Sequence, residues 1–217
     1  MTDGAARAEQ YSHDPDWEWL LRQPTPFDEF FGSLTFARNI GIDEMFQAFE
    51  IEPATIRVLT AEQALKDGGL RDAGFEDPPF WIRVATVGEW TVAIEFGQCK
   101  GNLEGVASAL AGRTEVVNVD YNTFAWSSLS YLTGDGMALG LTIGAPYDSA
   151  SGPALPRFEQ HLRSAGLLGG YVDRPPLRHI VATMSVLSRL VGITLPGEVC
   201  NGPLPTGYRM HPITRDP

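Results

Sequence analysis

The sequence predicts an α+β fold: one antiparallel β-sheet built from hairpins, with helices packed mainly on one face. The first observation is at residues 80–97, where two segments rich in β-branched and aromatic residues flank Gly88 and Glu89. The second is that most strands predicted between residues 80 and 143 are joined by hairpin-length links, which suit antiparallel pairing. The third is that helical patterns precede and follow this run of strands, as in α+β proteins.

The hairpin at residues 80–97 has a defined predicted register. Gly88 stands at the first central position of a two-residue turn, where a type II′ turn requires a positive φ. If Val87 and Trp90 close the turn, one face is apolar except for Arg83 and the other is mixed. The apolar face then carries the pairs Val87/Trp90, Ala85/Val92, Arg83/Ile94 and Trp81/Phe96. We expect this face to form a wall of the core, where Arg83 needs a carboxylate or backbone acceptors.

The other elements follow from local patterns along the chain. Further strands are predicted at residues 33–37, 57–59, 114–121, 124–129, 131–133 and 137–143, the last two flanking a glycine-rich turn. Helices are predicted to begin near residues 42–44, 60, 103, 155 and 176. The helix near residue 60 opens on Thr60-Ala61-Glu62-Gln63, which has the pattern of a capping box.

The chain divides into three predicted regions. Residues 1–32 are an N-terminal extension with an aromatic cluster, residues 33–195 are the α+β core domain, and residues 196–217 are a loop-like C-terminal tail. The tail is rich in Pro and Gly, which interrupt regular structure. The aromatic cluster of the extension includes Trp17 and Trp19, which either extend the core or form an interaction surface.

Composition limits the classes of function. The net charge of −11 argues against binding to nucleic acids or anionic membranes, which need a basic face, and is compatible with a basic protein partner. The apolar content of 43% is enough for a substantial core, yet no run approaches the 18 residues of a membrane span. The N-terminus has no apolar segment typical of a signal peptide, so we expect a cytoplasmic protein. Cys99 and Cys200, far apart, predict neither a disulfide nor a zinc site.

Six short motifs follow one another between about residue 33 and residue 205. They are Leu34–Arg38 with the helix start at Asp43-Glu44, Leu59–Ala64, Trp81–Val84 with Val87–Trp90, Gly112–Val117, the Gly134–Gly136 turn, and Leu190–Ile193 before Asn201–Leu204. In this combination the chain resembles an uncharacterised, mainly actinobacterial family catalogued as domain of unknown function 6461. The aromatic N-terminus and the Pro-rich tail depart from the pattern of that family. The resemblance implies the architecture and brings no catalytic residues.

The sequence lacks the strong signatures of catalysis. It has no phosphate-binding loop, zinc-protease helix, nucleophile elbow or Cys-x-x-Cys pair, so we predict no catalytic residue, metal site or cofactor. Candidate binding residues are the aromatics of the extension, the two charges inside the hairpin, and polar residues at a strand end and a turn. They are Trp17, Trp19, Arg83, Glu95, Tyr121 and Asp135.

Two hypotheses on function remain open at this point, and whether the chain is an enzyme is undecided. The first is a non-enzymatic, acidic, cytoplasmic protein-binding module, of the kind that neutralises a partner protein as immunity proteins do. The alternative is a small-molecule enzyme or ligand-binding protein. Its pocket would lie between the apolar wall and the helices, with Arg83, Glu95 and Tyr121 as polar groups. A structural subunit of a larger assembly is a third reading, and the oligomeric state is not fixed by the sequence.

Overall fold

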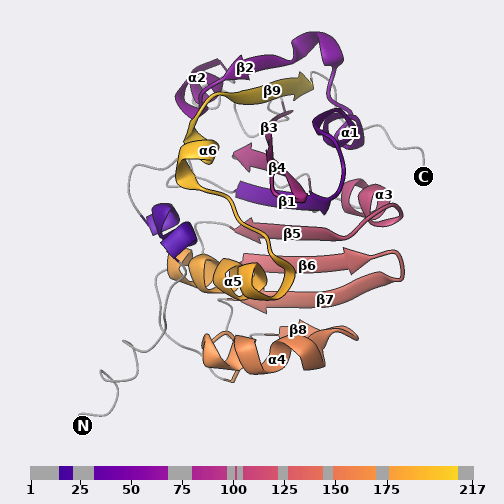
Figure 1. Ribbon diagram of the computed structural model, residues 1–217, viewed down its shortest axis with the longest axis vertical. Helices are drawn as coiled ribbons and strands as arrows, with labels where there is room; N and C mark the ends of the chain where they lie inside the picture. Colours follow the sequence, from indigo (N-terminus) through magenta and orange to yellow (C-terminus); the bar gives the residue numbers. More distant parts are fainter. Residues whose placement is uncertain are drawn as a thin grey trace.

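The protein is built on one nine-stranded antiparallel sheet, with the strand order β2-β9-β3-β4-β1-β5-β6-β7-β8 (Figure 1). The computed structural model describes residues 15–21, 32–67, 80–96, 101, 105–121, 127–143, 149–169 and 176–209. The strands are β1 (Gly32–Arg38), β2 (Arg57–Leu59), β3 (Phe80–Val87), β4 (Trp90–Phe96), β5 (Val116–Tyr121), β6 (Ser127–Thr133), β7 (Gly136–Ile143), β8 (Ser149–Ser151) and β9 (Leu204–Arg209). The predicted α+β class is confirmed.

Helices cover the two faces of the sheet unequally. The helical elements are η2 (Pro15–Leu21), α1 (Ile42–Ala48), η3 (Pro53–Thr55), α2 (Ala61–Asp67), α3 (Val106–Ala111), α4 (Leu155–Ser164), α5 (Pro176–Val191) and α6 (Gly197–Asn201). Side chains from η2, α2, α4, α5 and α6 share one core with the face turned toward the reader in Figure 1, which we call the front face. Helices α1 and α3 pack on part of the opposite face, the rear face, and form a smaller core there. Helices therefore lie mainly on one face, as predicted.

The central hairpin has the predicted register. Val87 pairs with Trp90, and the pairing continues as far as Arg83 with Ile94. Gly88 has φ of +60°, which fits the first central position of a type II′ turn. The wall residues Trp81, Ala85, Trp90, Val92 and Ile94 are all buried in the front core. The apolar alternation of these two strands therefore fixes which face meets the large helices.

The capping box predicted before α2 is also present. The Thr60 hydroxyl accepts a hydrogen bond from the Gln63 backbone N–H at 3.2 Å, and the Gln63 side chain accepts one from the Thr60 N–H at 2.9 Å. The two bonds satisfy backbone donors that the first turn of a helix leaves without partners.

The prediction of a loop-like tail over residues 196–217 is wrong for residues 197–209. These residues form α6 and β9, and β9 lies inside the sheet between β2 and β3 (Figure 1). Leu204 and Tyr208 are buried against the front core, and Gly207 lies where a Cβ atom would be 2.3 Å from Ile51. The rest of the predicted tail, residues 210–217, lies outside the described residues. Two neighbouring strands and a packed core thus override the local effect of Pro and Gly.

The described part of the N-terminal extension belongs to the front core. Helix η2 packs on α5 and α6, and Trp17 is fully buried. The indole N–H of Trp17 donates to the Ser188 hydroxyl at 2.6 Å, and that of Trp19 donates to the Leu195 carbonyl at 2.7 Å. Of the two readings of the aromatic cluster, these contacts favour the one in which Trp17 and Trp19 extend the core. The remaining aromatic residues of the extension lie outside the described residues.

Candidate functional site

Arg83 is a buried structural cation. Its side chain is 0% exposed on the front face, and its guanidinium donates to the carbonyl oxygens of Cys200 and Gly202 at the end of α6 and to Leu59 at 3.1 Å. Burial lowers the pKa of Arg83 to about 10, so the side chain remains a cation at neutral pH. The predicted need for backbone acceptors is met, because three carbonyls converge on the charge. Arg83 therefore joins β2, β3 and α6, and is not available to anchor a ligand.

The thiol of Cys200 lies beside this guanidinium and is fully buried. Burial raises the pKa of Cys200 to about 12, an effect that the positive charge of Arg83 only partly opposes. Because only the thiolate reacts, the fraction of reactive Cys200 at pH 8 should be about a thousandfold below that of an ordinary cysteine. In a Cys99→Ser variant, the native protein should react with Ellman's reagent at least that much more slowly than the urea-unfolded chain. Reaction of native Cys200 at the rate of the unfolded chain would contradict the burial.

Glu95 lies on the rear face and takes part in a buried polar network. The register places Glu95 opposite Ser33, and Ser33 opposite Asp120. In the next row, Thr35 is opposite Asn118. All five side chains are at least nine-tenths buried. Arg83 and Glu95 thus fall on opposite faces of the hairpin, as the predicted register requires.

One amide, that of Asn118, connects three other members of this network. The oxygen of Asn118 accepts from the hydroxyls of Thr35 at 2.8 Å and Ser33 at 3.0 Å, while its nitrogen donates to both carboxylate oxygens of Asp120 at 3.2 Å. The hydroxyl of Ser128 also donates to Asp120, at 3.1 Å. Each hydroxyl and amide dipole is therefore oriented toward the carboxylate, which lowers the cost of burying that charge.

The polar network is closed by the protein's own backbone at Gly101. The Gly101 N–H donates to Glu95 at 2.9 Å, and a Cβ atom at this glycine would be 2.0 Å from the Thr35 hydroxyl. The space above Thr35 and Glu95 is thus filled by main chain, which leaves no room for a ligand at that point. We assign Glu95 a structural role, as the acceptor that holds this backbone on the sheet.

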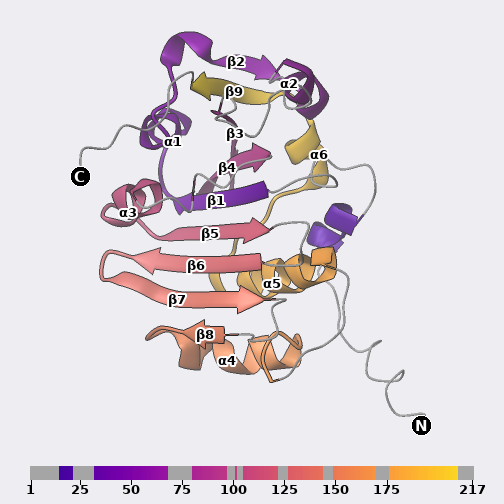
Figure 2. The same cartoon turned by 180° about the vertical axis from the view of Figure 1, so that it is seen from behind.

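The two polar rows continue across the sheet beyond the network. One row passes from Asp120 to Ser128 on β6, Thr142 on β7 and Ser149 on β8, and the other from Asn118 to Ser130, Gly140 and Ser151. Leu129, Tyr131, Leu139 and Leu141, between these positions, point to the front core. The rear residues of β6 and β7 in these rows are half-buried, and Ser149 and Ser151 are exposed. In Figure 2, no described helix crosses this part of the sheet.

An exposed methionine completes this surface. Met137 at the start of β7 is 53% exposed, and its sulfur lies over Gly140, where a Cβ atom would be 3.0 Å away. We call the combined surface the outer rear face. It consists of Ser128, Ser130, Met137, Gly140, Thr142, Ser149 and Ser151. It has an apolar centre with small hydroxyl side chains around it.

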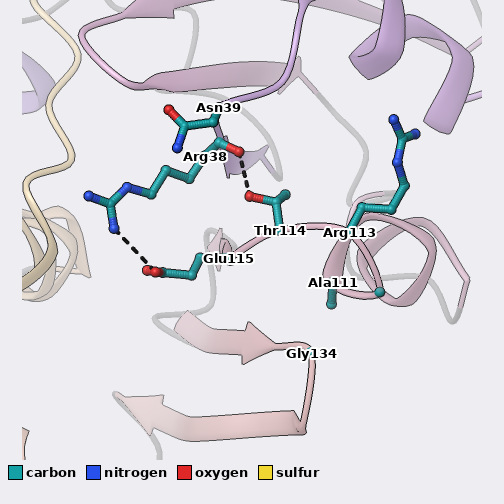
Figure 3. Close-up of a pocket in the computed structure, with 8 residues that line it drawn as sticks. Arg38, Asn39, Ala111, Arg113, Thr114, Glu115 and Gly134 are labelled. Carbon is teal, nitrogen blue, oxygen red and sulfur yellow. Dashed lines mark hydrogen bonds and ion pairs between the residues drawn. The ribbon is translucent and has the colours of Figure 1, made fainter.

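A cleft of about 400 Å³ lies next to the β6–β7 turn, which directly precedes Met137 (Figure 3). Its charged groups are engaged with one another. Arg38 pairs with Glu89 at 2.7 Å and Glu115 at 3.2 Å, and the Tyr131 hydroxyl donates to Glu115 at 2.9 Å. Arg113 pairs with Glu44 on α1 and points away from Arg38 in Figure 3. These contacts tie together β1, β5 and the central turn, so we interpret the cleft as a structural junction.

The remaining predicted site residues do not converge. The structure describes only the backbone of Tyr121, paired with Gly32 and Ser127, and Asp135 is exposed in the β6–β7 turn. Trp17 and Arg83 belong to the front core, whereas Glu95 is on the rear face. Sequence reasoning missed the outer rear face, although polar residues alternate with apolar ones along both β6 and β7. That alternation was the available signal, but it does not show which strands will be neighbours.

Two further observations bear on the class of site. Within the described ranges, no group of three or more His, Cys, Asp or Glu side chains is placed to hold a metal ion. In the same ranges, no helix combines the length and apolar character needed to cross a membrane.

Comparisons with protein-family models, with curated proteins and with solved structures found no match to the chain. The resemblance to the uncharacterised family stays a prediction.

Proposed function

We propose that the chain is a non-enzymatic protein-binding module of the immunity type, which acts in the cytoplasm by occupying a basic surface of a partner protein. The observation that supports it best is how the positive charges are used. Ion pairs engage Arg38, Arg57, Arg113, Arg163 and Arg209, and backbone carbonyls engage Arg83 and Arg157. Among the described residues, exposed carboxylates remain at Asp43, Glu62, Asp135 and Glu198, and the whole chain has a net charge of −11. An acidic surface of this kind speeds association with a basic partner.

The packing of the front core does not favour the pocket that the alternative hypothesis predicted. A pocket between the apolar wall and the helices would need open space beside residues such as Trp81 and Trp90, yet each is only 2% exposed and lies in the front core. Two of its three polar groups lie on opposite faces of the sheet: Arg83 binds carbonyls on the front face, and Glu95 holds Gly101 on the rear face. Among the described residues, protein binding is the better supported of the two.

The test is affinity capture of the tagged full chain from lysate of its own host, followed by purification of the captured protein and measurement of binding with both components pure. We expect a basic partner at stoichiometric ratio. Its association rate constant should fall by about tenfold or more between low and roughly physiological salt, because screening removes electrostatic steering. No enriched protein, or an association rate insensitive to salt, would refute the proposed function.

A further inference from the structure

We infer that the outer rear face is the docking surface for the basic partner, and that the partner presents an apolar side chain to Met137 within a ring of Arg, Lys and other hydrogen-bond donors. This inference rests on the proposed function and adds a location and a chemistry to it. The surface lies on β6, β7 and β8, where Figure 2 shows the rear of the sheet without a described helix across it.

Met137 supplies the apolar centre of the surface. Among the described residues, the large hydrophobic side chains that are strongly exposed are Met137 at 53% and Val58 at 67%. Val58 stands alone on the short edge strand β2, at the far side of the sheet. Met137 instead folds back over Gly140, where a Cβ atom would lie 3.0 Å from its sulfur and 3.5 Å from the Ser151 hydroxyl. An unbranched thioether adapts to irregular partners, and Met is enriched at protein interfaces.

Hydroxyl groups surround this centre. Ser149 and Ser151 on β8 are exposed, and Ser130 and Thr142 are half-buried on the neighbouring strands. A hydroxyl both donates and accepts, so such a ring satisfies a wide range of polar partners. An apolar centre with a polar rim is the usual anatomy of a protein interface. Small side chains also let another protein approach the sheet closely.

The charges around the surface select the partner. Asp120, at the inner end of one polar row, is buried and accepts hydrogen bonds from Asn118 and Ser128. The exposed carboxylate described beside this surface is that of Asp135, in the turn before Met137. The polar rows, as far as the structure describes them, contain no Lys or Arg. Arg113, beside the neighbouring cleft, is already paired with Glu44. An exposed carboxylate, with no described Lys or Arg in the polar rows, is complementary to a positive charge on the partner. A second copy of this chain would bring acid against acid at a net charge of −11 on each side.

The first experiment measures the affinity of the purified partner for variants of the full chain. Ser149→Arg places a positive charge on the exposed rim, and Met137→Ala removes the apolar centre. Both should weaken binding by about tenfold or more. Met137→Ala removes contacts at the centre of the interface, and Ser149→Arg adds a charge that repels a basic partner. Ser164→Arg, at an exposed position of α4 beside the front core, is the matched control and should stay within about twofold. All three positions are on the surface, so the variants should fold, which their melting temperatures check.

The second experiment is oxidation footprinting with hydrogen peroxide, read by mass spectrometry. Exposed Met137 should be oxidised rapidly in the free protein, whereas Met45 and Met184, both fully buried, serve as internal references. In the complex we expect Met137 to be protected by about tenfold, with the two buried residues unchanged. This readout needs no substitution, so it does not depend on the folding of a variant.

The outcomes separate the two proposals. If no partner is captured, the proposed function fails and takes this inference with it. If a partner binds with salt-dependent association but the Met137 and Ser149 variants bind like the native chain and Met137 remains oxidisable, the function stands and this location is wrong. If Met137 becomes protected in the chain alone as its concentration rises, with a dimer in sedimentation velocity, the occupant is a second copy and the inference of a basic partner is overturned.

Discussion

Replacing Arg83 with methionine should lower the free energy of unfolding by about 3–5 kcal/mol. Methionine matches much of the length of arginine but donates no hydrogen bond. The carbonyls of Leu59, Cys200 and Gly202 would then lose the donor that they share in the interior. Each acceptor left without a partner costs on the order of 1–3 kcal/mol, and solvent cannot replace the lost bonds because Arg83 is 0% exposed. Urea denaturation followed by tryptophan fluorescence measures the change.

Arg57→Met is the matched control for this substitution. Arg57 is on the neighbouring strand β2 with a side chain that is 61% exposed, and its carboxylate partner Asp67 is 3.6 Å away. An exposed ion pair of this kind contributes about 0–1 kcal/mol, so this variant should unfold close to the native midpoint. If the Arg83 and Arg57 variants lost the same free energy of unfolding, the hydrogen bonds from Arg83 to three carbonyls would stabilise the fold no more than an exposed ion pair does.

The hairpin that contains Arg83 could be predicted from sequence because its information is local. Gly88 marks the turn, and alternation on both sides of it assigns every side chain to a face. The observed pairing from Val87/Trp90 to Arg83/Ile94 confirms that reasoning. The partners of Arg83 could not be found in the same way. Two of the three, Cys200 and Gly202, lie 117 and 119 positions away, in a segment whose composition resembles a loop.

Strand β9 shows why that segment was misread. Pro205 lacks a backbone donor and Gly207 has no side chain to pack, so both argue locally against a strand inside a sheet. In the structure β9 pairs with β2 on one side and with β3 on the other. Gly207 faces Ile51, which fills the place of a side chain at that position. The burial of Leu204 and Tyr208 stabilises a strand that propensity alone would reject.

The candidate docking surface could not be predicted from the sequence, for a related reason. Asn118, Ser130, Gly140 and Ser151 belong to four strands and form one row only through the pairings of β5, β6, β7 and β8. Each strand alone shows only that its polar residues face away from the core. Charge was informative at the level of the whole chain, but a net value does not show where the carboxylates gather. The sequence therefore predicts the type of partner more readily than the place where it binds.

Replacing Gly101 with alanine should destabilise the protein by about 2–4 kcal/mol. The new Cβ would lie 2.0 Å from the Thr35 hydroxyl oxygen, and 2.8 Å from both the Asn118 amide and the Glu95 carboxylate. These three side chains are at most 1% exposed, so they have no free space into which to move. The backbone at position 101 must therefore move away from the sheet, and this movement stretches the 2.9 Å hydrogen bond from its N–H to Glu95. Thermal and urea unfolding both report the loss.

The cause of this loss can be isolated with a double-mutant cycle. Thr35→Ala removes the atom that the new Cβ meets first, so in that background the cost of Gly101→Ala should fall by about 1 kcal/mol or more. Gly134→Ala is the control, because a Cβ there meets nothing within 4 Å and the change should cost under about 0.5 kcal/mol. If the costs of Gly101→Ala and Thr35→Ala simply added, the backbone at Gly101 would not be seated on the polar network. The space above Glu95 and Thr35 on the rear face would then be open to a ligand.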